Sequence, residues 1–179
     1  MAIILPPLQQ QASEIRVRLI REAFSFARAA SAVAGVRRIS LLGSILTTRP
    51  DPKDVDLLVR IAADADLARL ATCARRLQGA TQQFNRGADV FLADEGGRRY
   101  LGRTCPWKEC RFGVRLRCDA LHCGARPHLH DDLRTIKLPA TLVAAPPLDL
   151  WPTVERRCEL PADVARLLSE DWSPFATGE

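Results

Sequence analysis

The chain has 179 residues, of which 47% are hydrophobic and 26% are charged, and its formal net charge at pH 7 is +5. This length suits one well-buried domain and is too short for two large ones, and no apolar run approaches the roughly 18 residues that cross a membrane. The positive balance is compatible with a polyanionic partner such as nucleic acid.

The first seven residues, Met1 to Pro7, contain no basic segment followed by a long apolar one. They therefore do not resemble a secretory signal, and we expect a cytoplasmic protein without a membrane partner. The chain has six cysteines. In such a compartment they favour free thiols or metal ligands over disulfides.

A long helix is predicted from about Ser13 to Ala34. Apolar side chains recur there at intervals of three and four residues, which is the spacing of one helical face. These are Ile15, Leu19, Ala23, Phe26, Ala30 and Val33. The opposite face carries arginines that could contact RNA, although a solvated helix surface is the favoured explanation.

Two strand-like apolar runs follow, at about 38–42 and 55–61, and two acids, Asp54 and Asp56, open the second run. Successive side chains of a strand point to opposite faces, so these two carboxylates share one face. Carboxylates at this spacing repel each other unless a cation lies between them, and hard oxygen ligands suit Mg²⁺. The pattern therefore predicts a metal site.

A phosphate site is predicted beside these acids, because Gly43 and Ser44 end the first run. Glycine lets a phosphate approach the backbone closely, and serine adds a hydroxyl and the first amide of a following turn. Arg49 and Lys53 in the polar connection are candidates for holding a triphosphate, and surface solvation explains them equally well. Phosphoryl or nucleotidyl transfer requires a metal site beside a phosphate site.

A second amphipathic helix is predicted from about Ala65 to Gln78, followed by a short strand from Ala88 to Leu92. The order strand, strand, helix, strand implies an α/β sheet with acids at adjacent strand ends. Asp89, near the start of the later strand, is the third acid of the predicted site.

The segment from Arg98 to Lys137 differs in character, because its ten basic and four acidic residues leave an excess of six positive charges. Tyr100, Trp107 and Phe112 are interleaved with the basic residues. Aromatic and basic side chains together suit stacking on unpaired bases, and they can equally pack beneath the arginine stems.

The same segment contains four cysteines with paired spacing, which could hold a structural Zn²⁺. They are Cys105, Cys110, Cys118 and Cys123. The spacing is not the usual two-residue gap, so reduced, partly buried thiols are favoured over zinc. His122, His128 and His130 are further candidates for ligands or a general base.

The final part of the chain is predicted to contain a strand at about Leu133 to Leu138. Prolines at positions 146, 147 and 152 indicate a connection, and a closing helix is predicted from about Pro161 to Trp172.

The motif Leu42-Gly43-Ser44, the pair Asp54-Val55-Asp56 and the later Asp89 together resemble the pattern of the nucleotidyltransferase superfamily. That pattern is a hydrophobic residue followed by Gly-Ser, an acid-x-acid pair on the next strand, and a third acid on a later strand. The resemblance covers about residues 37–92. It is closest to the small, minimal nucleotidyltransferases, including those of bacterial toxin-antitoxin modules.

The resemblance implies a role for each of these residues. Gly43 and Ser44 would bind the nucleotide phosphates, and Asp54 and Asp56 would bind Mg²⁺. Asp89 would join the metal site and help to deprotonate the acceptor hydroxyl. The fold implied is an α/β (α+β) nucleotidyltransferase-like mixed sheet flanked by helices, with residues 1–97 as the core and the basic, Cys/His-rich residues 98–179 packed on it.

The expected activity is Mg²⁺-dependent transfer of a nucleoside monophosphate from an NTP, such as ATP, to an acceptor hydroxyl. The basic second half makes an RNA 3′ end, such as that of a tRNA, the first expected acceptor and a protein hydroxyl the second. A toxin with an antitoxin partner is one setting for this activity. The competing class is a non-catalytic RNA-binding or regulatory module.

Overall fold

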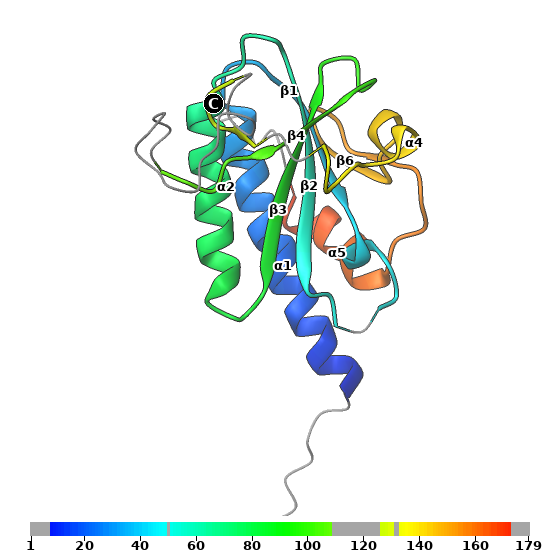
Figure 1. Ribbon diagram of the computed structural model, residues 1–179. Coiled ribbons are helices and arrows are strands. Elements are labelled where there is room, and N and C mark those ends of the chain that lie inside the picture. Colours follow the sequence, from blue (N-terminus) through cyan, green and yellow to red (C-terminus); the bar gives the residue numbers. More distant parts are fainter. Residues whose placement is uncertain (1–7, 50, 109–125, 131–132, 173–179) are drawn as a thin grey trace, which may run out of the picture.

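A mixed, open seven-stranded sheet packed with four helices forms the described part of the chain (Figure 1). The computed structural model describes residues 8–49, 51–108, 126–130 and 133–172, with side chains described from residue 14 onward. None of the helices in these ranges is long and apolar enough to cross a membrane.

Helices and strands are both spread along the whole described chain. In order they are α1 (Leu8–Ser31), β1 (Val36–Leu42), the 3₁₀ helix η1 (Ser44–Leu46), β2 (Asp54–Ile61), α2 (Leu67–Gln82), β3 (Gly87–Asp94), β4 (Tyr100–Thr104), β5 (Leu129–His130), α4 (Ala140–Ala144), β6 (Leu148–Trp151), β7 (Glu155–Arg156) and α5 (Ala162–Glu170).

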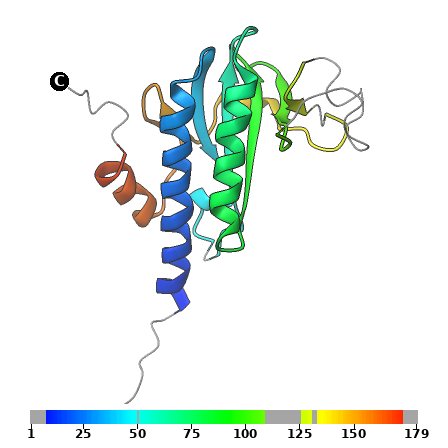
Figure 2. The same cartoon turned by 90° about the vertical axis from the view of Figure 1, so that its left-hand side faces the viewer.

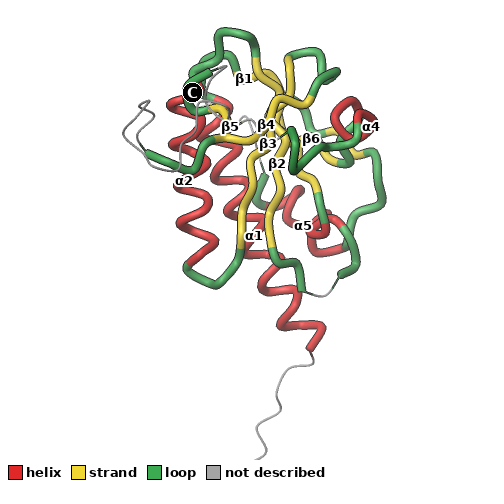
Figure 3. Tube along the Cα trace, in the orientation of Figure 1, coloured by secondary structure: helices red, strands yellow, loops and turns green. Residues whose placement is uncertain are grey.

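The strands lie in the order β5-β4-β3-β2-β1-β6-β7 (Figure 3). Strands β2 and β3 are parallel and are connected by α2, while the other neighbouring pairs are antiparallel. Because parallel strands start at the same edge of a sheet, the first residues of β2 and β3 lie side by side. Strands from both halves of the chain therefore belong to one sheet.

One face of the sheet is covered by α1, α2 and α5 (Figure 2). The alternate residues Val55, Leu57 and Val59 of β2 are fully buried against these helices. The tryptophan after α5 packs on α1, where the ring centroids of Phe24 and Trp172 are 4.9 Å apart. Burial of such side chains provides most of the stabilisation of this layer, at about 25 cal/mol per Å² of apolar area.

The opposite face is covered only in its middle part. The apolar residues there are Leu42, Leu58, Phe91, Ala93 and Tyr100, against which Val143 of α4 and the partly buried Ile136, Leu138 and Leu142 pack. Alternate residues of a strand share a face. Asp56 therefore lies on the same face as Leu58, and Asp89 lies on the same face as Phe91. The acids therefore lie beside this apolar cluster.

A buried carboxylate organises the same face near β6. Asp149 is 1% exposed. It accepts hydrogen bonds from Ser40 Oγ at 2.5 Å, Arg38 Nη1 at 2.7 Å and Arg157 Nη2 at 2.9 Å. Two guanidinium groups and a hydroxyl offset the cost of burying this charge, and they hold β6 in register on β1.

The predicted mixed α/β sheet is confirmed, as are the two long helices, the closing helix and the strands that became β1, β2 and β3. The strand predicted at 133–138 is wrong: residues 133–135 form a turn, and 136–139 form no regular element. Ile136 and Leu138 instead pack on the sheet as a covering segment. The sequence pattern also missed β4, α4 and β6, of which the latter two lie in the predicted proline-rich connection.

Candidate functional site

The three predicted acids lie on the adjacent strands β2 and β3. Asp56 pairs directly with Asp89 across the parallel ladder, and Asp54 pairs with Gly87. Asp54 lies two residues before Asp56, so all three carboxylates are on the face of the sheet that carries no long helix. The side chains of Asp56 and Asp89 are partly buried, and Asp54 is exposed. We call this group the acid cluster.

The electrostatics of the acid cluster are unfavourable without a cation. Burial, followed by the negative charges of Asp54 and Asp89, raises the pKa of Asp56 from 3.8 to about 6. The three carboxylates are therefore close enough to oppose each other's ionisation. A cation between them would remove this opposition and lower the pKa of Asp56.

Gly43 contacts the acid cluster with its backbone. It follows the last residue of β1, Leu42, which pairs with Asp56. Its φ of +82° is in the region that favours glycine, and a Cβ built on it would lie 2.5 Å from Asp56 Oδ2. A side chain at this position would therefore collide with the carboxylate, and only glycine permits the approach.

Ser44 opens η1 at the end of β1. The turn is closed by the amide of Leu46, which donates to the Gly43 carbonyl at 3.2 Å, and by that of Thr47, which donates to the Ser44 carbonyl at 3.0 Å. The Ser44 side chain is half-buried. The motif identified in the sequence thus becomes a tight turn beside the acid cluster.

A cavity of about 690 Å³ borders Gly43 and this turn. Its lining is Gly43, Leu46, Thr47, Thr48, Pro147, Cys158, Glu159, Leu160, Pro161 and Ala162. This volume is within the range of about 300–1,000 Å³ that small-molecule sites occupy. Half of the lining comes from the segment leading into α5, a region for which the sequence predicted no role in the site.

The two predicted cations of the connecting loop are exposed. The loop itself is fixed at Arg49, whose carbonyl accepts a hydrogen bond from Arg16 of α1. Arg16 is 7% exposed and also donates to Asp163 Oδ2 at 2.9 Å, at the start of α5. Lys53 precedes β2, and its carbonyl accepts from the amide of Gly87 at 3.0 Å. The structure thus fixes both residues through their backbone carbonyls, and that of Lys53 lies at the start of β3.

Arg103 of β4 is a site residue that the sequence did not predict. Its Nη1 donates to Asp89 Oδ1 at 2.8 Å, and its side chain is 25% exposed. A hairpin signal was present, since Gly96 and Gly97 separate two runs that pair. Recognising it would have placed Arg103 on the strand next to Asp89.

The donor set of the acid cluster fits a hard divalent cation such as Mg²⁺, because its ligands would be carboxylate oxygens. In the described ranges, no group of three or more His, Cys, Asp or Glu side chains is arranged to hold a metal ion as it stands. The hydrogen bond from Arg103 occupies one carboxylate oxygen of Asp89. A cation bound by all three acids would be held through the other oxygen of Asp89.

The predicted zinc ligands fall mostly outside the described residues. Cys105 follows β4 and is 4% exposed, and its amide donates to the His128 carbonyl at 2.8 Å. Cys110, Cys118, Cys123 and His122 lie outside the described ranges. Of the two other histidines, His128 lies in the turn before β5, where burial lowers its pKa, and His130 is in β5.

Comparison with protein-family models, with curated protein sequences and with solved structures finds no match to this chain. Inference about its function therefore rests on the residues and geometry described above.

Proposed function

We propose that this protein is a Mg²⁺-dependent nucleotidyltransferase of nucleotidyltransferase-like fold. It would transfer a nucleoside monophosphate from an NTP to an acceptor hydroxyl. The observation that carries this proposal is the pairing of Asp56 with Asp89, with Asp54 on the same face and the Gly43 backbone against the Asp56 carboxylate. A carboxylate cluster beside a glycine-containing turn has the parts that metal-assisted phosphoryl chemistry needs.

The cavity beside Gly43 supports a position for the nucleotide. The triphosphate would lie over the turn at Gly43, where Ser44 supplies a hydroxyl and the turn supplies backbone amides. The base and ribose would extend into the cavity, between Leu46 and Leu160. This arrangement brings the α-phosphate toward the acid cluster and leaves the side facing Arg103 for the acceptor.

The three residues of the acid cluster would have different roles in the reaction. Asp54 and Asp56 would hold the cations, and Asp89 would hold a cation and accept the proton of the attacking hydroxyl. Bound Mg²⁺ would supply charge neutralisation for the triphosphate and for the leaving pyrophosphate. Arg103 orients the Asp89 carboxylate through one oxygen, which leaves the other available for the acceptor or the cation. The protein contributes positioning and fixed charge.

The acceptor that we propose is an RNA 3′ end. The excess positive charge of residues 98–137 suits a polyanionic acceptor. In addition, the Trp107 side chain is 49% exposed, and Arg75 of α2 donates a hydrogen bond to the Trp107 carbonyl at 3.0 Å. An exposed aromatic side chain beside guanidinium groups suits stacking on an unpaired base.

A labelled-transfer assay tests the proposal. The protein would be incubated with each α-³²P-labelled NTP, Mg²⁺ and either total RNA or cell protein, in parallel with Asp54→Asn and Asp56→Asn. Asp64→Asn serves as a matched control, because Asp64 is an exposed acid in the turn between β2 and α2. Label should enter RNA with the wild type and the control, and each cluster variant should lose about 100-fold or more of the rate.

Transfer that survives in both cluster variants, or no transfer with any NTP and acceptor, would refute the enzymatic proposal. Label that enters protein rather than RNA would favour the protein-hydroxyl alternative. RNA binding without transfer would favour the non-catalytic module.

A further inference from the structure

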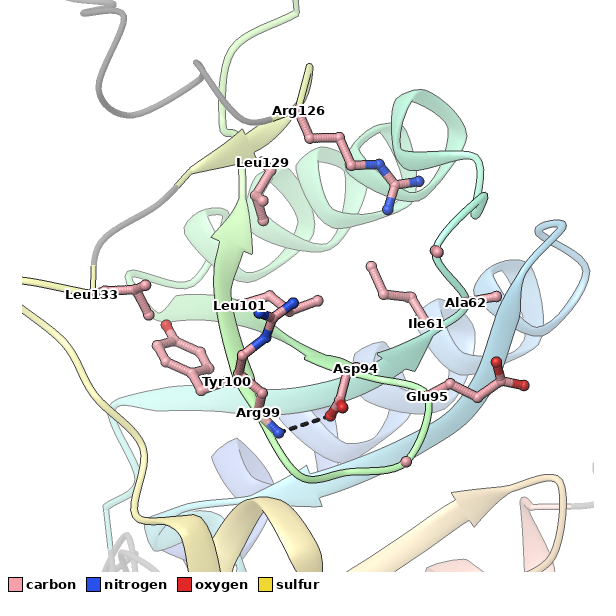
Figure 4. Close-up of a pocket in the computed structure, with 12 residues that line it drawn as sticks. Ile61, Ala62, Asp94, Glu95, Arg99, Tyr100, Leu101, Arg126, Leu129 and Leu133 are labelled. Atoms are coloured by element: carbon pink, nitrogen blue, oxygen red, sulfur yellow. Dashed lines mark hydrogen bonds between the residues drawn. The ribbon is translucent and has the colours of Figure 1, made fainter.

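A second cavity, of about 570 Å³, lies at the other ends of β2 and β3 from the acid cluster (Figure 4). It includes Ile61, five residues after Asp56, so it lies about 17 Å along the strand from the cluster at about 3.3 Å per residue. The hairpin between β3 and β4 and the turn before β5 complete its walls. The proposed nucleotidyltransferase chemistry makes no use of this cavity.

The cavity has an apolar floor. Ile61 at the end of β2, Leu101 of β4 and Leu129 of β5 contribute aliphatic side chains, and Tyr100 and Leu133 close one side (Figure 4). Leu133 is 45% exposed, which is unusual for a large aliphatic side chain. The apolar surface is therefore accessible from solvent and can contact the body of a ligand.

Two guanidinium groups lie over this floor. Figure 4 shows the Arg99 side chain crossing the middle of the cavity beside Leu101 and the Arg126 side chain reaching in from the opposite side. One nitrogen of the Arg126 guanidinium donates a hydrogen bond to the Ala65 carbonyl. Within the described ranges, no hydrogen bond or ion pair of the Arg99 guanidinium is present, although its backbone amide is bonded.

Within the described residues, neither acid of the lining forms an ion pair with the Arg99 guanidinium. Asp94 Oδ1 accepts from the backbone amides of Arg98 and Arg99, at 2.7 and 2.8 Å, which closes the hairpin. Glu95 forms an ion pair with Arg37 Nε at 2.8 Å, and its carboxylate points away from Arg99 in Figure 4. The amides leave the charge of Asp94 in place, but Arg99, Arg126 and Arg37 together outnumber the two acids by one positive charge.

We propose that this cavity binds a small organic anion. Its aryl or acyl body would lie on Ile61 and Leu101, and its carboxylate, sulfonate or phosphate group would pair with Arg99, with Arg126 adding a second donor. An inorganic anion would leave the apolar floor unused, and a neutral ligand would leave the Arg99 charge without a partner. This inference is independent of the proposed transferase activity.

Methyl NMR tests the proposal at the cavity itself. Protein labelled with ¹³C at the Ile and Leu methyl groups would be titrated with naphthalene-2-sulfonate, with decanoate, with neutral naphthalene-2-methanol and with inorganic sulfate. We expect saturable shifts at Ile61, Leu101 and Leu129 with the two organic anions. The neutral analogue should bind about tenfold more weakly than the sulfonate, because it lacks the charged hydrogen bond.

The matched pair Arg99→Gln and Arg98→Gln separates a specific contact from general charge. Arg98 is the exposed neighbour in sequence and is not part of the lining. Arg99→Gln should raise the Kd of the sulfonate about tenfold and leave that of the neutral analogue unchanged, whereas Arg98→Gln should change neither. In the wild type, added NaCl should weaken binding of the two organic anions and leave that of the neutral analogue unchanged.

Four results would overturn the proposal, three of them seen with the organic ligands. These are an absence of saturable shifts, equal effects of the two arginine variants, and shifts centred on Leu46 and Leu160 of the cavity beside Gly43. Binding of inorganic sulfate as tight as that of the sulfonate would also contradict it, because the apolar floor would then contribute nothing. If the methyl spectrum of Arg99→Gln showed lost folding, the salt dependence of the wild type would decide.

Discussion

Replacing Asp56 by asparagine should stabilise the metal-free protein at pH 8. The folded state holds the pKa of Asp56 at about 6, against 3.8 for an unperturbed aspartate. Ionising this carboxyl is therefore more costly in the folded protein than in the unfolded chain. Asparagine keeps the shape of the side chain and removes that cost.

The magnitude follows from the shift. About two pKa units at roughly 1.4 kcal/mol each set a ceiling of about 3 kcal/mol. Asp56 is only partly buried, so water screens its interactions, and we expect a gain of about 1 to 2 kcal/mol. The destabilisation by Asp56 is absent below its unfolded pKa, grows between pH 4 and 6, and is complete above its folded pKa of about 6.

Urea denaturation in EDTA at pH 4, 5, 6 and 8 measures this difference, with Asp64→Asn as the control outside the acid cluster. The advantage of Asp56→Asn over the wild type should vanish near pH 4 and reach its full value by about pH 7. Adding Mg²⁺ at pH 8 should stabilise the wild type more than the variant, because the variant lacks a ligand. A variant that is no more stable than the wild type at pH 8, or an advantage independent of pH, would refute the argument.

Three further substitutions test other contacts. Gly43→Ala should cost about 1–3 kcal/mol of stability and weaken Mg²⁺ binding, seen by calorimetry, because its Cβ meets the Asp56 carboxylate at a positive φ. Asp149→Asn should lower the free energy of unfolding in urea by about 2–4 kcal/mol, because two guanidinium groups lose their shared anion. Arg16→Ala should cost about 2–3 kcal/mol by the same measurement, and a double-mutant cycle with Asp163→Ala should show coupling between the two residues. If a variant were as stable as the wild type, the contact that it removes would not stabilise the fold.

The acids of the site were predictable because they depend on local periodicity. Two acids separated by one apolar residue must share a face of a strand, and Asp54 and Asp56 do so. The predicted helix between the two strands implied that they are parallel neighbours. Asp89 could therefore be expected on the strand next to Asp54 and Asp56. The register that puts Asp89 opposite Asp56 was not readable, because no short-range signal sets it.

The partners of the site were not predictable, because they come from pairings distant in sequence. Strand β6 adds to β1 across about 110 residues and brings Pro147 and the segment leading to α5 to the cavity beside Gly43. Arg103 was missed because glycine and arginine interrupt the apolar pattern of β4. The segment around Ile136 was misassigned because alternating apolar residues can lie on a sheet without joining its ladder.

The contacts of Arg16 make the loop beside the acid cluster depend on the last helix of the described chain. One guanidinium joins α1, the carbonyl of Arg49 and the first turn of α5, and its partner Asp163 is 147 residues away in sequence. During synthesis from the N-terminus, this anchor cannot form until α5 has left the ribosome. Strands β1 to β3 could already pair by then, so the acid cluster would assemble before the loop beside it is fixed. Ligand binding at the turn would thus wait for the synthesis of α5.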